Sequence, residues 1–493
     1  MIIRIKIDGF KSLLKTDLYF GPFTCIAGAN AIGKSNFFDA LQFLSKLADN
    51  SILQAAKSIR SENQKHSDIK DIFFKSGMHY YKKMSFEVDM IVPQKAEDDL
   101  GQIAEAKITS LKYILELKLN DEGDDSEPIE ILREELQPIT LGNAQKGLYF
   151  DFKKDWLDTV LEGRRAGTPF ISTSGKIIKL HSDSRDNKRG GRTTEFTAEK
   201  MPRTLLSTVT AESPTAFLAR QEMRNWIMLQ FEPSALRQPN SIYEVKNAEI
   251  TANGNNLPAT LYRLHSEKKE EDVYQILTNK LKGLVNDVDE IDVDKDERRD
   301  LLTLQIKFKD GLILPAQSLS DGTLRFLGLA IIKEDSKSSG LICLEEPENG
   351  INPKKVEEMV RLLEEMATDT TCEIDEDNPL RQVIINSHSP LVVSIVADES
   401  LYLATEKEMY SEEFKKKIKY TGFLALSDTW KTKNNLIYKT SIGEIHSYLD
   451  KSIIETEKKP FTLFEESSEY SNSNTIKKKR TVLENVRQLS LHF

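Results

Sequence analysis

The stretch that decides the fold is GANAIGKS, residues 28–35. An apolar run, FTCIA, precedes it, and NFFDAL follows it as the first turns of a helix. A glycine-rich loop between a strand and a helix turns backbone N–H groups and a helix N-terminus toward phosphate oxygens. This Walker A pattern predicts nucleoside triphosphate binding, in which Lys34 reaches the β- and γ-phosphates and Ser35 holds Mg²⁺. A chance match in a glycine turn is the alternative, and the two flanks disfavour it. The predicted nucleotide-binding residues are Gly28, Asn30, Gly33, Lys34, Ser35 and Asn36.

Composition limits what else the chain does. Its 493 residues predict two or three domains, and a net charge of −10 leaves any DNA or RNA contact to local basic patches. The cysteines Cys25, Cys343 and Cys372 form no metal-binding pair, and the first two lie in apolar runs typical of buried strands. The longest apolar runs are far too short to span a membrane. We therefore expect a cytoplasmic protein without a membrane partner.

A second motif, LICLEE at residues 341–346, is an apolar run that ends in two carboxylates. A buried parallel strand has this pattern, and its end delivers side chains to the edge of the sheet where α/β folds bind ligands. Glu345 is then placed to hold Mg²⁺ through water, and Glu346 to orient or deprotonate the attacking water. The alternative is a solvated acidic turn, since Glu348 continues the acidic run.

Three further motifs accompany this Walker B segment. LSDGTLR, residues 319–325, places a serine and a glycine at a helix start, and an ordinary capped helix from Ser320 or Asp321 is the alternative. NGINP, residues 349–353, predicts a turn into a helix over 354–366. VIINSHSP, residues 383–390, predicts a strand that ends at His388, either as a γ-phosphate contact or as a satisfied strand-end histidine.

The order Walker A, Leu-Ser-x-Gly, Walker B, Asn-Gly-Ile-Asn-Pro and histidine resembles the heads of ATP-binding-cassette (ABC) ATPases. The resemblance implies a head-to-head dimer with two ATP molecules between the subunits. Ser320 and Gly322 would form the signature motif, acting in trans on the partner's γ-phosphate. His388 would be the switch histidine, and Asn349 and Gly350 would belong to the D-loop.

The opening IDGFKS, residues 7–12, together with LSDGT, EEPE and SHSP, resembles the RecF/SMC-like branch. Within it the motifs, and GNNLPATLYRL at 254–264, are most similar to OLD-type ATPases and ATPase subunits of anti-phage systems, Septu- or PARIS-like. Gln54 and Gln64 are both candidates for the family's Gln-loop, and neither is assigned. OLD-type nucleases carry a Toprim domain with converging carboxylates, and no such pattern follows residue 390. A separate effector protein, a nuclease, is therefore expected.

The predicted fold class is α/β: an ABC-type P-loop ATPase head, with a mixed sheet core and an antiparallel lobe. The predicted regions are 1–120 (first part of the head), 121–299 (an inserted α+β or helical region), 300–405 (second part of the head) and 406–493 (a C-terminal extension). Strands are expected over 85–92 and 113–119, and a helix over 272–286. The sequence shows no long heptad pattern, so we expect no full SMC-type coiled-coil arm. A linker over 465–474 and a docking helix over 482–493 are expected in the extension.

The leading functional hypothesis is an ATP-hydrolysing subunit that acts as the sensor or regulator of a bacterial anti-phage defence complex. The effector of that complex would be a separate protein. A RecF-like DNA-repair clamp is the alternative, and a transporter subunit and an ATP-binding scaffold are weaker ones. Basic segments at 184–192, 415–419 and 477–480 either contact phosphate backbones of DNA or RNA or are solvated.

Overall fold

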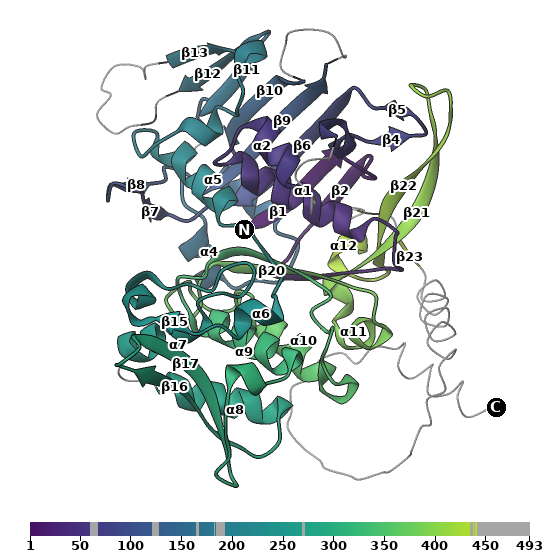
Figure 1. Cartoon of the computed structure of the whole chain (residues 1–493). Coiled ribbons are helices and arrows are strands. Elements are labelled where there is room, and N and C mark those ends of the chain that lie inside the picture. Colours follow the sequence, from purple (N-terminus) through teal and green to yellow (C-terminus); the bar gives the residue numbers. More distant parts are fainter. Residues whose placement is uncertain are drawn as a thin grey trace, which may run out of the picture.

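The computed structural model describes residues 1–59, 68–120, 128–163, 167–181, 183, 193–268, 272–433, 437 and 439–440. Two large sheets and a smaller one are packed with helices, and this mixed α/β architecture confirms the predicted ATPase-head fold class (Figure 1). The basic segments 184–192 and 477–480, Gln64, the predicted linker and the predicted docking helix lie outside the described residues.

The first large sheet carries the Walker motifs. Its strands follow the order β14 (Ile227–Leu229), β19 (Gly340–Glu345), β20 (Arg381–Ser387), β3 (Phe23–Ala27), β21 (Leu401–Ser411), β22 (Lys416–Leu426) and β23 (Lys439–Thr440). The strands from β14 to β21 are parallel, and β22 pairs antiparallel with β21. Every residue of β3 and β20 is buried, because parallel sheets of this kind are covered on both faces.

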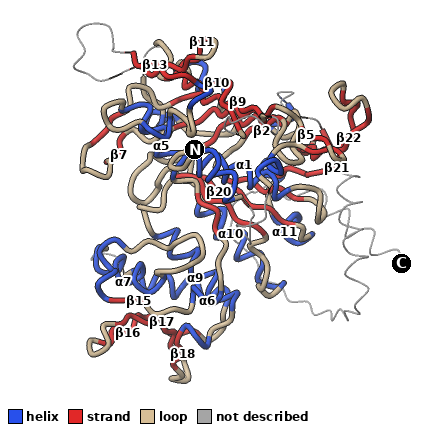
Figure 2. Tube along the Cα trace, turned by 45° about the horizontal axis from the view of Figure 1, so that its top comes forward, coloured by secondary structure: helices blue, strands red, loops and turns tan. Residues whose placement is uncertain are grey.

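The two faces of this sheet belong to different hydrophobic clusters. Ile26 and Ile384 pack with helix α1 (Lys34–Leu47) and the second large sheet, whereas Cys25 and Ile385 pack with α9 (Asp321–Glu334) and α10 (Val356–Met366). This alternation is the period of two that strands impose. Helices α7, α9 and α10 lie between strand β20 and the small sheet (Figure 2).

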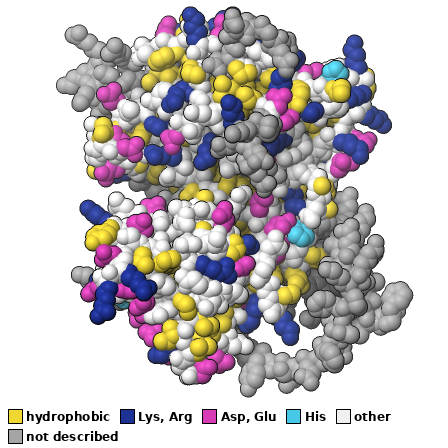
Figure 3. Space-filling view, in the orientation of Figure 1, with side chains coloured by type: hydrophobic (Ala, Val, Ile, Leu, Met, Phe, Trp, Pro, Cys, Tyr) yellow, Lys and Arg dark blue, Asp and Glu magenta, His cyan; other side chains and the backbone are white. Residues whose placement is uncertain are grey.

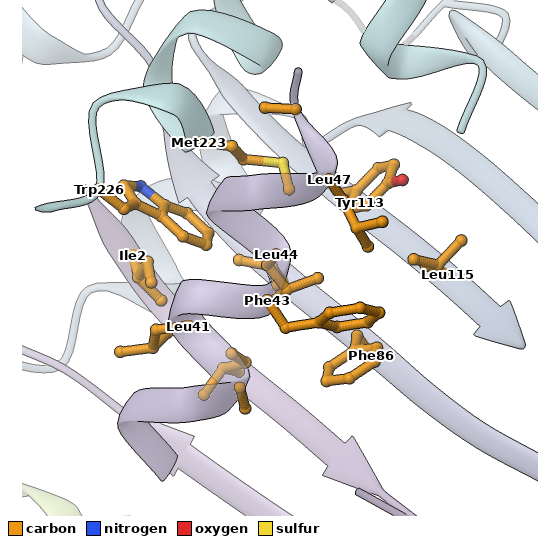
Figure 4. Close-up of a cluster of buried hydrophobic side chains, with 14 of the residues drawn as sticks. Ile2, Leu41, Phe43, Leu44, Leu47, Phe86, Tyr113, Leu115, Met223 and Trp226 are labelled. Carbon is orange, nitrogen blue, oxygen red and sulfur yellow. The ribbon is translucent and has the colours of Figure 1, made fainter. Parts of the chain in front are cut away.

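The second large sheet is antiparallel throughout. Its strands follow the order β13 (Thr193–Thr197), β12 (Ile177–His181), β11 (Ile171–Ser174), β10 (Ile129–Pro138), β9 (Ser110–Leu119), β6 (Lys83–Ile91), β1 (Ile2–Asp8) and β2 (Thr16–Tyr19). The strands expected over 85–92 and 113–119 are β6 and β9, which pair directly. Helix α1 packs its apolar side chains against this sheet, as the cluster in Figure 4 shows.

The small sheet comprises β15 (Asn240–Ser241), β17 (Leu301–Phe308), β16 (Val288–Asp296) and β18 (Ile313–Pro315). Helices α7 (Leu257–Glu267) and α8 (Val273–Leu284) pack with it, and α8 is the helix predicted over 272–286. Residues 121–299 thus contribute strands to both large sheets and to the small sheet. The four predicted regions remain predictions as domain boundaries.

The remaining elements are short. They are α2 (Ile52–Ser58), α3 (Leu141–Gly147), α4 (Lys154–Val160), α5 (Pro214–Arg224), α6 (Pro233–Leu236), α11 (Pro390–Ile395), α12 (Trp430–Lys433), β4 (Lys75–Ser76), β5 (His79–Tyr80), β7 (Lys95–Glu97) and β8 (Ile103–Glu105). Among the described residues, no helix combines the length and the apolar character needed to cross a membrane. Basic and acidic side chains are interspersed on the face shown in Figure 3.

The cluster around α1 gives a stability prediction. Phe43 is fully buried, and its ring centroid lies 5.8 Å from that of Phe10 and 5.9 Å from that of Phe86. Phe43→Ala leaves a cavity, and we expect it to cost about 3–5 kcal/mol and to lower the midpoint of thermal unfolding. Met78→Ala is the control, because Met78 is 91% exposed. Equal midpoints for the two variants would contradict this packing.

Candidate active site

The predicted motifs meet at one edge of the parallel sheet. Ala27, the last residue of β3, pairs with Ser387 at the end of β20, and Asn386 pairs with Glu345 at the end of β19. Because the strands run in the same direction, the P-loop, His388 and the two Walker B acids all follow strand ends on that edge. The backbone N–H of Gly28 also donates to the Ser387 carbonyl, 3.3 Å away.

The P-loop is closed by its own lysine. Lys34 Nζ donates to the carbonyl oxygens of Gly28, at 2.7 Å, and of Ala29, at 2.9 Å. Burial lowers the pKa of Lys34, while the carboxylates of Glu346, Glu345 and Glu348 oppose that shift. Asn30 is exposed at the loop's tip. The buried ammonium therefore lies at a site rich in negative charge and bonds to carbonyls of the loop that would hold phosphate.

A chain of hydrogen bonds fixes this loop to β22. Asn36 Nδ2 donates to Ser12 Oγ at 2.7 Å, and Ser12 Oγ lies 2.6 Å from Thr421 Oγ1. Thr421 Oγ1 in turn donates to the Ile32 carbonyl at 2.7 Å. The side chain of Asn36, predicted to bind nucleotide, is thus engaged in bracing the loop. Ser12 and Thr421 had no predicted role, and no local pattern around Thr421 marks it.

The Walker B acid is clasped on both oxygens. Glu346 Oε1 lies 2.7 Å from His388 Nδ1, and Oε2 accepts a hydrogen bond of 2.8 Å from Asn349 Nδ2. Its backbone N–H donates to both the carbonyl and the side-chain oxygen of Asn386, at 3.1 Å each. The structure therefore brings together three residues predicted from separate motifs: the water-orienting acid, the switch histidine and the D-loop asparagine.

A further carboxyl lies behind this clasp. Glu348 is buried, and Ser387 Oγ donates a short hydrogen bond to its Oε1. Burial raises the pKa of Glu348, and the Ser387 hydroxyl acts against that shift. The sequence showed Glu348 only as part of an acidic run, and its contact with Ser387 depends on long-range pairing.

The predicted Mg²⁺ ligands have suitable chemistry. Ser35 lies partly exposed in the first turn of α1, and Glu345 ends β19. Hydroxyl and carboxylate oxygens are ligands that Mg²⁺ prefers, and Mg²⁺ commonly takes one or two protein ligands plus substrate phosphates. Within the described residues, no cluster of three or more His, Cys, Asp or Glu side chains forms a metal cage of its own. The residues present fit a metal bound together with a nucleotide.

The signature motif begins helix α9. Ser320 is its N-cap, and its Oγ accepts the Thr323 N–H at 3.2 Å, so the capped helix and the signature motif coincide here. A Cβ at Gly322 would lie 2.4 Å from the Gly350 carbonyl oxygen. Signature and D-loop backbones are therefore in direct contact within one chain. They line a cavity of about 350 Å³ together with Asn286 and Lys355.

Gln230 is a site residue that sequence reasoning missed. It follows β14, whose Leu229 pairs with Leu344, so it lies beside the Walker B strand end. A cavity of about 480 Å³ is lined by Gln230 together with Arg325, Glu345, Glu346 and Asn349. Gln54, one of the two Gln-loop candidates of the sequence, instead closes a capping box at the start of α2. The short strand β14 gives only a weak sequence signal, the apolar run before Gln230.

Glycine at position 33 gives a prediction about the loop. Gly33 has φ +97°, and a Cβ there would lie 2.2 Å from Thr421 Oγ1 and 2.5 Å from Ser12 Oγ. We expect Gly33→Ala to weaken binding of a fluorescent ATP analogue about 5- to 150-fold, because strain of roughly 1–3 kcal/mol distorts the loop. Gly142→Ala is the matched control, since nothing lies within 4 Å of its added Cβ. Unchanged affinity in Gly33→Ala would refute the importance of this close approach.

Residues 23–95 and 236–394 match the model of a family described as "AAA domain, putative AbiEii toxin, Type IV TA system". These segments contain the Walker A, signature, Walker B, D-loop and switch-histidine motifs. Comparison with curated proteins gave no match.

Solved heads of SMC proteins are similar at low identity. One, an SMC head bound to the C-winged helix domain of ScpA, has 14% identity and a TM-score of 0.43, with 86% of this chain and 98% of that chain covered. Another, an SMC head with an extended coiled coil bound to the C-terminal domain of ScpA from Pyrococcus furiosus, has 14% identity and a TM-score of 0.41. It covers 93% of this chain and 98% of that chain. The SMC head domain from Thermotoga maritima has 12% identity and a TM-score of 0.35, with 85% of this chain and 97% of that chain covered. The matched AAA family and the motif geometry are both typical of a P-loop ATPase.

Proposed function

We propose that this chain binds ATP with Mg²⁺ at the P-loop and hydrolyses it, with Glu346 as the residue that orients and deprotonates water. The observation that carries the proposal is the clasp of Glu346 by His388 and Asn349 on the P-loop edge of the sheet. A catalytic base needs a fixed carboxylate near a buried cation and a phosphate site, and this edge combines them.

When bound, Mg²⁺ would neutralise part of the charge on the ATP phosphates. Lys34 would exchange its carbonyl partners, Gly28 and Ala29, for phosphate oxygens. Ser35 and Glu345 would hold the metal. Glu346 accepts the proton of the attacking water, while His388 and Asn349 keep its two oxygens in place. Gln230 lines the same cavity as both acids and is suited to sense whether the site is filled.

The test is the rate of phosphate release from ATP. We expect Glu346→Gln to reduce the turnover rate by about 10²–10⁴-fold, because the amide accepts no proton, and to leave ATP affinity close to that of the wild type. Glu357→Gln, an exposed acid on α10, is the control. Wild-type turnover in Glu346→Gln would show that another group activates the water.

We further propose that two heads close face to face around ATP, so that Ser320 and Gly322 complete the partner's site. The contact between Gly322 and Gly350 supports this, because it joins the signature surface to the D-loop that clasps Glu346. A helix N-terminus capped by Ser320 also presents N–H groups that suit a γ-phosphate.

Complementation tests the shared site. We expect neither Lys34→Ala nor Ser320→Arg to hydrolyse ATP alone. An equimolar mixture should recover roughly a quarter of the wild-type rate, because half the dimers are mixed and each has one intact composite site. A mixture as inactive as its components, with nucleotide binding by Ser320→Arg intact, would show that the signature does not act in trans.

The cellular role we propose is sensing or regulation in an anti-phage complex of the OLD-, Septu- or PARIS-like kind, with a separate effector, a nuclease. The toxin named in the matched family's description supports a defence role, and the described residues hold no cluster suited to a two-metal nuclease. Adding double-stranded DNA to the turnover assay separates the alternatives. Stimulation without an accessory protein would favour a RecF-like repair clamp, whereas a DNA-insensitive rate favours a protein partner.

A further inference from the structure

We propose that Glu348 is a positioning residue that ties the D-loop to the switch histidine through the hydroxyl of Ser387. This inference rests on the proposed ATPase function. It assigns a role to a carboxyl that is neither one of the two Walker B acids nor a proposed metal ligand.

Glu348 belongs to the D-loop turn but points into the protein. Only 8% of its surface is exposed, and its Oε1 accepts the hydrogen bond of Ser387 Oγ. Its Oε2 is buried and makes no hydrogen bond within the described part of the chain. The backbone carbonyl of Glu348 accepts the Ile351 N–H at 3.0 Å, which fixes the turn that follows. The carboxyl thus anchors the D-loop from inside.

Ser387 is the point at which three parts of the site join. It is fully buried at the end of β20, and its carbonyl accepts the N–H of Gly28 in the P-loop. Its Oγ donates to Glu348 and accepts the N–H of Ser389 at 3.0 Å. His388 lies between these two serines, so the side-chain bridge fixes the backbone on both sides of the imidazole.

The segment of Glu348 and Asn349 and the segment of Ser387 and His388 both contact Glu346. Asn349, next to Glu348, holds one oxygen of Glu346, and His388, next to Ser387, holds the other. If the hydrogen bond between Glu348 and Ser387 is removed, the positions of Asn349 and His388 are no longer fixed relative to each other. A displacement of about 1 Å at a catalytic group is enough to cost up to about 10²-fold in rate.

The geometry distinguishes this role from that of a base. Glu345 and Glu346 line the 480 Å³ cavity, whereas the carboxyl of Glu348 is buried against Ser387. A positioning carboxyl needs only to accept the serine hydrogen bond, which a glutamine amide oxygen also does. A base, in contrast, must ionise, and glutamine abolishes it.

Four variants therefore test the inference in the full chain, with ATP affinity, KM and kcat measured for each. We expect Glu348→Ala and Ser387→Ala each to lower kcat about 10- to 100-fold with ATP affinity unchanged. Glu348→Gln should keep kcat within about fivefold of the wild type, since at most one ordinary hydrogen bond is weakened. The double variant Glu348→Ala/Ser387→Ala should be no slower than the slower single variant, because both substitutions break one bridge. Glu373→Gln, an exposed acid, is the control.

Wild-type kcat in Ser387→Ala would overturn the inference, and so would additive losses in the double variant. Loss of turnover in Glu348→Gln equal to that in Glu348→Ala would make Glu348 a proton acceptor instead. Ser387→Ala removes a single oxygen, so it remains informative if Glu348→Ala fails to fold. Absence of turnover in the wild type would refute the proposed ATPase function, and full turnover in Glu346→Gln would refute the proposed role of Glu346, so both are separate from these outcomes.

Discussion

The parallel pairing of β19, β20 and β3 is the constraint on which the site depends. β3 and β19 are almost wholly buried apolar runs, and β20 is buried along its whole length, with an apolar centre over Val383, Ile384 and Ile385. Because the three run in the same direction, the P-loop, the acids and the switch histidine emerge on one edge. The register of these strands, in which Ala27 pairs with Ser387 and Glu345 pairs with Asn386, fixes how far each strand end extends along that edge. A slip by one residue would exchange the faces of a strand and separate these groups.

This constraint also explains how much of the molecule was predictable. Walker A, Walker B and His388 were placed from the sequence because strand ends in a parallel sheet share an edge whatever lies between them. Gln230 and the pair Ser12 and Thr421 were not, since their places depend on which distant strands become neighbours. The strands of residues 121–299 join both large sheets and the small sheet through such tertiary pairing, which local β-propensity does not specify.

The electrostatics of the edge favour a bound nucleotide. Lys34 is buried, and carbonyl dipoles alone are weak partners for a buried charge. Burial lowers the pKa of Lys34, and the carboxylates of Glu346, Glu345 and Glu348 oppose that shift. A phosphate that replaces the two carbonyls adds charge-assisted hydrogen bonds. The same acids would repel that phosphate, and a divalent cation bound with the nucleotide would offset this repulsion.

In the proposed function, one stretch of backbone would couple hydrolysis to contact with a second head. Gly322 and Gly350 touch main chain to main chain, so no flexible side chain absorbs a shift of helix α9. Arg325 on that helix adds a second tie, donating to the Asn349 carbonyl at 3.1 Å. Asn349 is also the residue that donates a hydrogen bond to Glu346, so movement of helix α9 would alter the position of the Glu346 carboxylate. Coupling free energies act equally in both directions. If a partner on the signature surface favours this arrangement of Glu346 and His388, ATP bound against those residues would favour the partner to the same extent.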